Sequence, residues 1–114
     1  MRFVTAVFPI LLNLAAATFH FSCVCNSITP GTDWAYNWEL TKYACLHNYA
    51  GGADYDSGSG RCIPNGDNTL DGDQWLADCR RDGTVDGYYR YKKDDTLDLS
   101  VTLWVWKASS TCGD

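Results

Sequence analysis

Residues 20–27, HFSCVCNS, set the central constraint on the fold, because only one residue separates Cys23 from Cys25. Two cysteines this close would form a strained ring if they bonded each other, so each needs a distant partner. Residues i and i+2 of a β-strand project from the same face. The alternation over 19–26 therefore predicts a first strand that turns four side chains toward the core: Phe19, Phe21, Cys23 and Cys25.

The first residues, 1–17, have the features of a secretory signal peptide. Arg2 supplies the positive start, an apolar run covers 3–16, and Ala17 is a small residue suited to cleavage after it. The run is shorter than the roughly 18 to 20 apolar residues that a membrane span needs, so we expect cleavage rather than anchoring. The mature protein is then a single small domain over 18–114.

All six cysteines lie in the mature part of the chain. An even number in a short secreted protein predicts three disulfides. Zinc binding is the alternative, and it is disfavoured because no CxxC pair is present and His20 and His47 are not at a ligand spacing. Each bridge adds on the order of 2 to 4 kcal/mol to a domain with a small core. The cysteines are Cys23, Cys25, Cys45, Cys62, Cys79 and Cys112.

The mature chain is acidic. Without Arg2, eight basic side chains face fourteen acidic ones, a formal net charge of −6. An acidic surface repels nucleic-acid phosphates and anionic lipid heads, so we expect neither nucleic acid nor a membrane as partner. No N-x-Ser/Thr sequon is present, so N-glycosylation is not expected.

A first helix is predicted over 33–49, after the break at Pro30-Gly31. Asp33 is placed to cap its start, and Gly51-Gly52 to end it. Side chains within one stripe at 100° per residue are expected to be buried, and the two tryptophans of this segment are therefore assigned to the core. The stripe holds Trp34, Trp38, Thr41, Cys45 and Tyr49.

Two further elements follow this helix. Residues 53–62 have the pattern of a β-hairpin that ends at Cys62. A shorter helix begins at Asp71, whose spacing to Gln74 resembles a capping box, and ends at Gly83. Its buried face is predicted to hold Trp75, Leu76 and Cys79.

The last third is predicted as two strands, 87–93 and 97–107, joined by a turn at Asp94-Asp95. Every second residue of the second strand is apolar, the period of a strand with one buried face. That face holds Leu97, Leu99, Val101, Leu103 and Val105, and the other holds Asp98, Ser100, Thr102, Trp104 and Trp106. These elements predict an α+β fold: an antiparallel sheet of four to five strands with two helices packed on one face, and three disulfides.

The predicted faces also indicate the disulfide pairing, although the sequence alone permits fifteen connectivities. Each helix offers one inward cysteine to the strand that carries the close pair. We therefore predict that this pair bonds the two helical cysteines, in either order, and that the other two bond each other. The predicted bridges join Cys23 and Cys25 to Cys45 and Cys79, and Cys62 to Cys112.

A small secreted ribonuclease is the enzyme class to consider, and it needs a Glu base, a His acid and a cation for the phosphate. Glu39 is the only glutamate. His47 lies eight residues further along the same predicted helix, about 12 Å away, which is too far for one proton-transfer site. His20 is the only other histidine, and no G-x-S-x-G motif is present for a hydrolase. We therefore predict no catalytic residues and no enzymatic activity.

Residues 67–73, DNTLDGD, resemble part of a calcium-binding loop. Positions 1, 3, 5, 6 and 12 of an EF-hand would fall on Asp67, Thr69, Asp71, Gly72 and Asp78. Position 12 requires a bidentate Glu, no helix is predicted before the loop, and Asp71 already caps a helix. We therefore expect a solvated acidic loop, with no bound metal and no other cofactor.

Aromatic side chains are the remaining functional candidates, because five Trp and seven Tyr are too many for so small a core to hide. The two tryptophans at the end of the last predicted strand lie opposite its apolar face. If exposed, they suit a protein partner or, by stacking on sugar rings, a polysaccharide. If covered or paired across strands, they only stabilise the sheet. The candidate partner-binding residues are Trp104, Trp106, Tyr89, Tyr91, Tyr36 and Tyr43.

The segments CVCN (23–26), TKYAC (41–45), YDSGSGRC (55–62) and LDGDQWLADC (70–79) carry a resemblance that covers Cys23 to about Gly83. Their succession resembles a pattern in small secreted cysteine-rich fungal proteins, many of them candidate effectors of plant pathogens. The order of elements is similar to effectors that share the ferredoxin-like sandwich of fungal killer toxins.

This resemblance implies a virulence factor that is exported to the host apoplast or translocated into host cells. It implies modulation of host immunity by binding a host component, and it supplies no catalytic residues. The alternatives are a killer-toxin-like antimicrobial protein, a cell-wall carbohydrate-binding protein and, further behind, a small secreted ribonuclease.

Overall fold

The computed structural model describes residues 19–113, so the predicted signal peptide 1–17 lies outside the described residues. Within this range, no helix has the length and apolar character needed to cross a membrane. The elements are β1 (Phe19–His20), β2 (Ser22–Ile28), β3 (Ala35–Tyr36), α2 (Trp38–Asn48), β4 (Ala53–Asp56), β5 (Arg61–Pro64), β6 (Leu70–Asp71), α3 (Gly72–Arg80), the π-helix η2 (Arg81–Asp86), β7 (Tyr88–Tyr91), β8 (Leu97–Leu103) and β9 (Lys107–Gly113).

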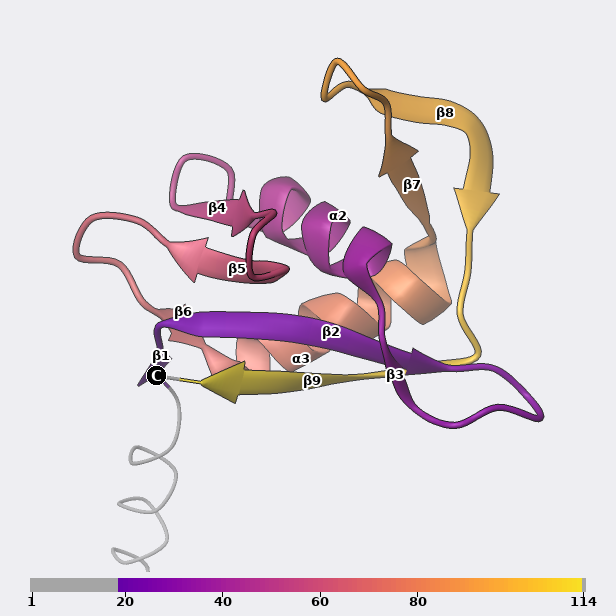
Figure 1. Cartoon of the computed structure of the whole chain (residues 1–114). Helices are drawn as coiled ribbons and strands as arrows, with labels where there is room; N and C mark the ends of the chain where they lie inside the picture. The colour runs from indigo at the N-terminus through magenta and orange to yellow at the C-terminus, as the bar shows by residue number, and fades with distance from the viewer. Residues whose placement is uncertain (1–18, 114) are drawn as a thin grey trace, which may run out of the picture.

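Strand β2 is the centre of a five-stranded sheet (Figure 1). Strand β9 runs antiparallel to it over its whole length, from the pair Ser22–Gly113 to the pair Ile28–Lys107. The other edge of β2 is shared by β3 and by β5, which continues the sheet to β4. The fold is α+β, with two helices and antiparallel sheets, as the sequence predicts.

The first helix begins later than its pattern indicates. Its N-cap is Asn37, whose side-chain oxygen accepts a hydrogen bond from the Leu40 amide at 2.9 Å, and not Asp33. The residues just before Asn37 instead pair with β2 as β3. Trp34 and Trp38 therefore lie outside the buried stripe, and their side chains are 48% and 50% exposed. Their assignment to the core is wrong.

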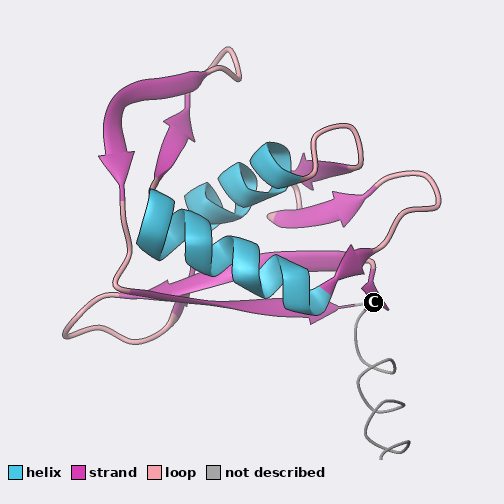
Figure 2. Ribbon diagram, turned by 180° about the vertical axis from the view of Figure 1, so that it is seen from behind, coloured by secondary structure: helices cyan, strands magenta, loops and turns pink. Residues whose placement is uncertain are grey.

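The second helix begins as predicted, since Asp71 accepts hydrogen bonds from the amides of Asp73 and Gln74. Helix α3 packs on β2 and β9 (Figure 2). The fully buried Trp75 donates its indole N–H to the Val24 carbonyl at 3.0 Å. The predicted end at Gly83 is wrong, because η2 continues the helical segment to Asp86.

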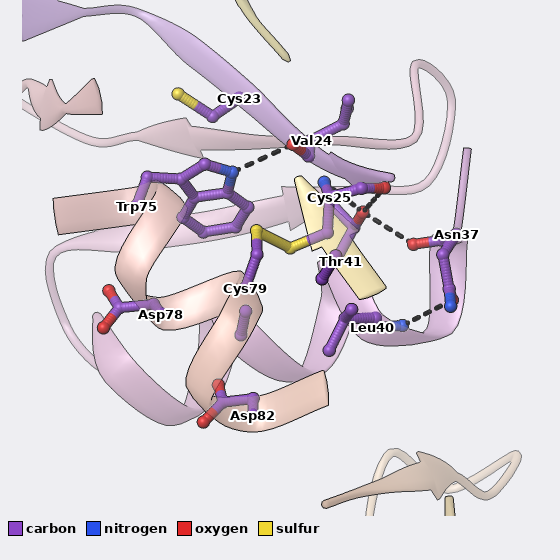
Figure 3. Close-up of a disulfide and its surroundings, with 12 residues drawn as sticks. Cys23, Val24, Cys25, Asn37, Leu40, Thr41, Trp75, Asp78, Cys79 and Asp82 are labelled. Atoms are coloured by element: carbon purple, nitrogen blue, oxygen red, sulfur yellow. Dashed lines mark hydrogen bonds between the residues drawn. A yellow bond between two sulfur atoms is a disulfide. The ribbon is translucent and has the colours of Figure 1, made fainter. Parts of the chain in front are cut away.

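The disulfides confirm one predicted bridge and correct two. The Cys25–Cys79 bond joins β2 to α3 and lies beside Trp75 (Figure 3). The partner of Cys23 is Cys112, because β9 places these two residues opposite each other. The third bridge, Cys45–Cys62, joins α2 to β5, on which the helix packs. The error has a single cause: β9 is absent from the predicted elements.

Two predicted buried faces are exposed in part. The chain bends at Phe21, where β1 leaves the line of β2 to pair with β6, and Phe19 and Phe21 are 65% and 59% exposed. At the other end, β7 and β8 form a hairpin beside the main sheet, and within residues 19–113 they pair only with each other (Figure 1). Leu99 and Val101 of β8 are therefore exposed, although their period is that of a strand with a buried face.

We predict that mapping of the non-reduced protein after cleavage before aspartates will release the peptide 33–53 joined only to 56–66. These peptides hold Cys45 and Cys62, which bond each other. Mass spectrometry identifies the pair, and reduction separates it as a control. A link from 33–53 to the peptide that holds Cys23 and Cys25 would contradict this connectivity.

Candidate functional site

The candidate aromatic residues do not form one patch. Trp104 and Trp106 are exposed, at 55% and 54%, while Tyr43 is buried and stacks on His47 with ring centroids 4.8 Å apart. Tyr89 is partly buried and packs edge-on against Tyr43. Tyr43 lies in the core and offers little surface to a partner, so the structure gives no support to its assignment as a binding residue.

Trp106 instead lines a groove of about 300 Å³ together with Trp34, a residue that the sequence pattern assigns to the core. We call this surface the Trp34–Trp106 groove. Its lining consists of Trp34, Arg80, Thr84, Trp106, Lys107, Ala108 and Ser109.

The groove follows from the pairing of β2 with β9. The last pair of this ladder is Ile28–Lys107, so the loop after β2 and the residue before β9 emerge at the same end of the sheet. The loop turns tightly, with the Thr32 amide bonded to the Thr29 carbonyl at 3.1 Å and Gly31 at φ +86°. Its next residues bring Trp34 to the groove, whereas Trp106 directly precedes β9.

The groove is a basic spot on an acidic protein. Lys107 lies over the Trp106 ring with its Nζ 4.5 Å from the centroid. The Arg80 Nε donates to the Ala108 carbonyl at 3.2 Å. Neither cation forms an ion pair with a carboxylate among residues 19–113. The groove therefore combines two exposed tryptophans with positive charge that the described part of the chain does not neutralise.

A second aromatic groove contains Tyr36, Trp38 and Tyr55, but its polar groups are largely paired within the chain. The Tyr36 hydroxyl is bonded to the Gly60 carbonyl and to the Tyr55 hydroxyl. Burial, followed by the hydrogen bond with Tyr55, raises the pKa of Tyr36.

The cation of this second groove is also engaged. Lys42 forms an ion pair with Asp95 at 3.2 Å, and its Nζ lies 4.8 Å from the centre of the Tyr91 ring. A ligand in this groove would compete with contacts that the fold already makes. The Trp34–Trp106 groove is therefore the better candidate.

A buried acidic cluster joins α2 to α3 and η2. Asp78 accepts hydrogen bonds from the Tyr49 hydroxyl at 2.7 Å and from Arg81 at 2.9 Å. Asp82 accepts one from the Asn48 amide at 2.8 Å. Both carboxylates are almost fully buried, and burial raises the pKa of Asp82 against the opposing effects of Asn48 and Arg81. The cluster is closed by its own partners, as in a structural network.

The residues considered for catalysis lie apart. Glu39 pairs with Arg90, whereas His47 stacks on Tyr43. Within residues 19–113, no group of three His, Cys, Asp or Glu side chains is arranged to hold a metal ion. In the acidic loop, Asp71 serves as the cap of α3.

Comparison with known proteins gives no match: no family model, curated protein or solved structure is significantly similar to this chain. What the structure supports directly is a small cysteine-rich protein with three disulfides.

Of the two tryptophans of this groove, the sequence predicts only Trp106 as a binding residue. The reason is that Trp106 lies opposite an apolar face, although β8 ends at Leu103. Trp34 falls on the stripe of the predicted helix and is therefore assigned to the core, but α2 begins only at Trp38. The available signal was Asn37, an equally good N-cap that leaves Trp34 outside the helix.

We predict that Asp82→Asn will flatten the pH dependence of the free energy of unfolding. A carboxyl whose pKa is higher in the folded state binds its proton more tightly there, so wild-type stability falls as pH rises from about 4 through the raised pKa. The variant lacks this loss, and its stability relative to wild type should increase over the same interval.

Urea unfolding at a series of pH values measures this effect. Asp67→Asn is the matched control, since Asp67 is exposed, and it should leave the slope unchanged. Parallel pH profiles for wild type and Asp82→Asn would show that Asp82 carries no burial penalty.

Proposed function

We propose that this chain is a secreted protein that acts by non-catalytic binding of a host component, in the manner of a fungal effector. The signal-like start and the cysteine pattern support the class. The Trp34–Trp106 groove supports the mode of action, and it is the observation on which this proposal rests.

The composition of the groove suits a protein partner. Tryptophan and arginine are the residue types that contribute most to interface energies, because they combine large apolar area with directed polar contacts. Here two half-exposed indoles stand beside Arg80 and Lys107, whose charges no described carboxylate pairs. An acidic or mixed partner surface would bury the rings and neutralise the cations together.

The positions of the polar residues favour binding over catalysis. A general acid and a general base need to reach the same substrate atom within hydrogen-bond distance. Glu39 is engaged with Arg90, and the buried Asp78 and Asp82 are bonded to neighbouring side chains. These contacts support a role that does not depend on proton transfer.

The proposal predicts that a tagged mature protein will retain a host protein from host tissue, and that Trp34→Ala/Trp106→Ala will not. Each tryptophan at the centre of an interface contributes about 2 kcal/mol or more, so loss of both weakens binding well over tenfold. Quantitative mass spectrometry of the retained proteins measures the difference.

Trp38→Ala is the matched control, because Trp38 is equally exposed but lines the other groove. Retention by this variant should equal that of wild type. Retention by the double variant equal to that of wild type would show that the groove does not bind the partner.

A cell-wall glycan is the second candidate ligand, since two half-exposed indoles can stack on sugar rings. The same pair of proteins distinguishes the two. Retention of wild type on chitin or glucan, lost in Trp34→Ala/Trp106→Ala, would favour the glycan over a protein partner.

A further inference from the structure

We propose that the outer edge of β9 binds an extended acidic segment of the partner as an additional antiparallel or parallel strand, with one acidic side chain of that segment between Arg80 and Lys107. This inference rests on the proposed function in taking the partner to be a protein. It assigns the backbone of β9 as a binding site that continues the Trp34–Trp106 groove.

The register of β2 and β9 determines which backbone groups point outward. In antiparallel pairs, residues that exchange no hydrogen bonds have Cα atoms about 4.5 Å apart, against about 5.5 Å for bonded pairs. The Cys23 and Cys112 Cα atoms are 4.0 Å apart, so this pair is of the non-bonded kind.

A second observation gives the same register. The amide of Cys25 donates to the Thr41 hydroxyl at 2.9 Å, and its carbonyl accepts from the Asn37 amide at 3.0 Å. Both groups of Cys25 therefore point to α2 and β3, away from β9. Its partner Ser110 likewise directs its own N–H and C=O away from β2, and the alternation repeats along the strand. The outward residues are Ala108, Ser110 and Cys112.

At Ala108 the edge is covered, because this residue is buried and its carbonyl accepts from Arg80. Beyond Ala108, the edge has little of the protection that edge strands usually carry. Among residues 19–113, β9 pairs with no strand except β2. Its seven residues, KASSTCG, include no proline and a single charged side chain, Lys107. Edge strands normally avoid unwanted pairing by being short, charged or interrupted by proline. The opposite edge, β4, has four residues, two of them the exposed Asp54 and Asp56.

Part of the groove adjoins this edge. The Arg80 Nε reaches the Ala108 carbonyl, which is one of the outward groups. Residues 107–109 of β9 also line the groove. A strand added to β9 would therefore run alongside these lining residues, and one set of its alternating side chains would face the groove.

Charge selects the occupant. The two cations of the groove favour a segment that carries Asp or Glu. A second copy of this chain is a poorer occupant, because β9 itself brings a lysine to the shared edge and two acidic molecules repel each other. A partner segment in which acidic and apolar residues alternate satisfies both the strand geometry and the charge.

The test uses synthetic eight-residue peptides, N-acetylated and C-amidated, in which Val alternates with Glu, and the same peptides with Lys in place of Glu. Fluorescence anisotropy with the mature, oxidised protein should show binding of the Glu peptides and at least roughly tenfold weaker binding of the Lys peptides. Lys107→Glu should narrow or reverse this preference. Equal binding of the two peptides would overturn the charge assignment.

Backbone methylation tests the strand directly. Alternate residues of an extended peptide present their N–H groups to the same edge. N-methylation of all Val residues, or instead of all Glu residues, should therefore abolish binding in one case and leave it nearly unchanged in the other. Loss in both cases or in neither would overturn strand addition.

Ser110→Pro removes one outward N–H from β9 without removing a ladder bond to β2, and proline is tolerated at such edge positions. We expect this variant to keep its disulfide map and to bind the Glu peptide about tenfold or more weakly, since at least one hydrogen bond is lost and the approach is blocked. Ser110→Ala keeps the N–H and should bind as wild type does.

Amide exchange in the wild-type protein provides a measurement that does not depend on a variant. Addition of the Glu peptide should slow exchange at Ser110 and Cys112, which are only partly buried, and leave Ser109 and Thr111 unchanged. Protection without this alternation would contradict the proposal, and so would a Ser110-dependent dimer seen by sedimentation without peptide.

Failure of this inference is distinguishable from failure of the proposed function. If Trp34→Ala/Trp106→Ala loses the host protein and Ser110→Pro retains it, strand addition is wrong and the groove stands. If the wild type retains no host protein, yet Glu peptides bind and protect alternate β9 amides from exchange, strand addition to β9 is confirmed and the proposed function is wrong.

Discussion

The structure depends on the connections of one residue, Cys25. Its side chain bonds Cys79 on α3, and its backbone bonds Thr41 and Asn37 at the start of α2. A bridge over a sequence separation of 54 residues stabilises the fold by about 4 kcal/mol, because it restricts the unfolded chain. Through this residue, β2 holds both helices while its other edge remains free to pair with β9.

The pairing with β9 explains most of what distinguishes this molecule. It places Cys23 opposite Cys112, and the disulfide between them holds the end of the chain. It also brings the loop after β2 beside the start of β9. Trp34 and Trp106, which are 72 positions apart in the sequence, line the same groove for that reason. The candidate site is thus a consequence of the sheet's register and does not come from any local motif.

Local patterns predicted those elements whose determinants lie within a few residues. Asp71 caps α3 because its own side chain reaches two nearby amides, and Cys25, Cys45 and Trp75 are buried as their spacing indicates. The alternating pattern gave a wrong prediction of burial where the apolar face has no other element to pack against. Leu99 and Val101 alternate as in a buried strand, yet the β7–β8 hairpin leaves them exposed, since it pairs with no other strand of the described chain.

The amino-acid sequence alone determined the α+β class, the presence of three disulfides and the acidic surface, because these follow from composition, short-range spacing and charge. Only the tertiary structure decided which cysteines bond, which tryptophans line one groove and which edge of the sheet stays open. These depend on how β9 returns to β2 across a separation of 89 residues between Cys23 and Cys112. No local sequence pattern predicts the pairing of β9 with β2, because the free energy that favours it comes from burial and strand pairing throughout the domain.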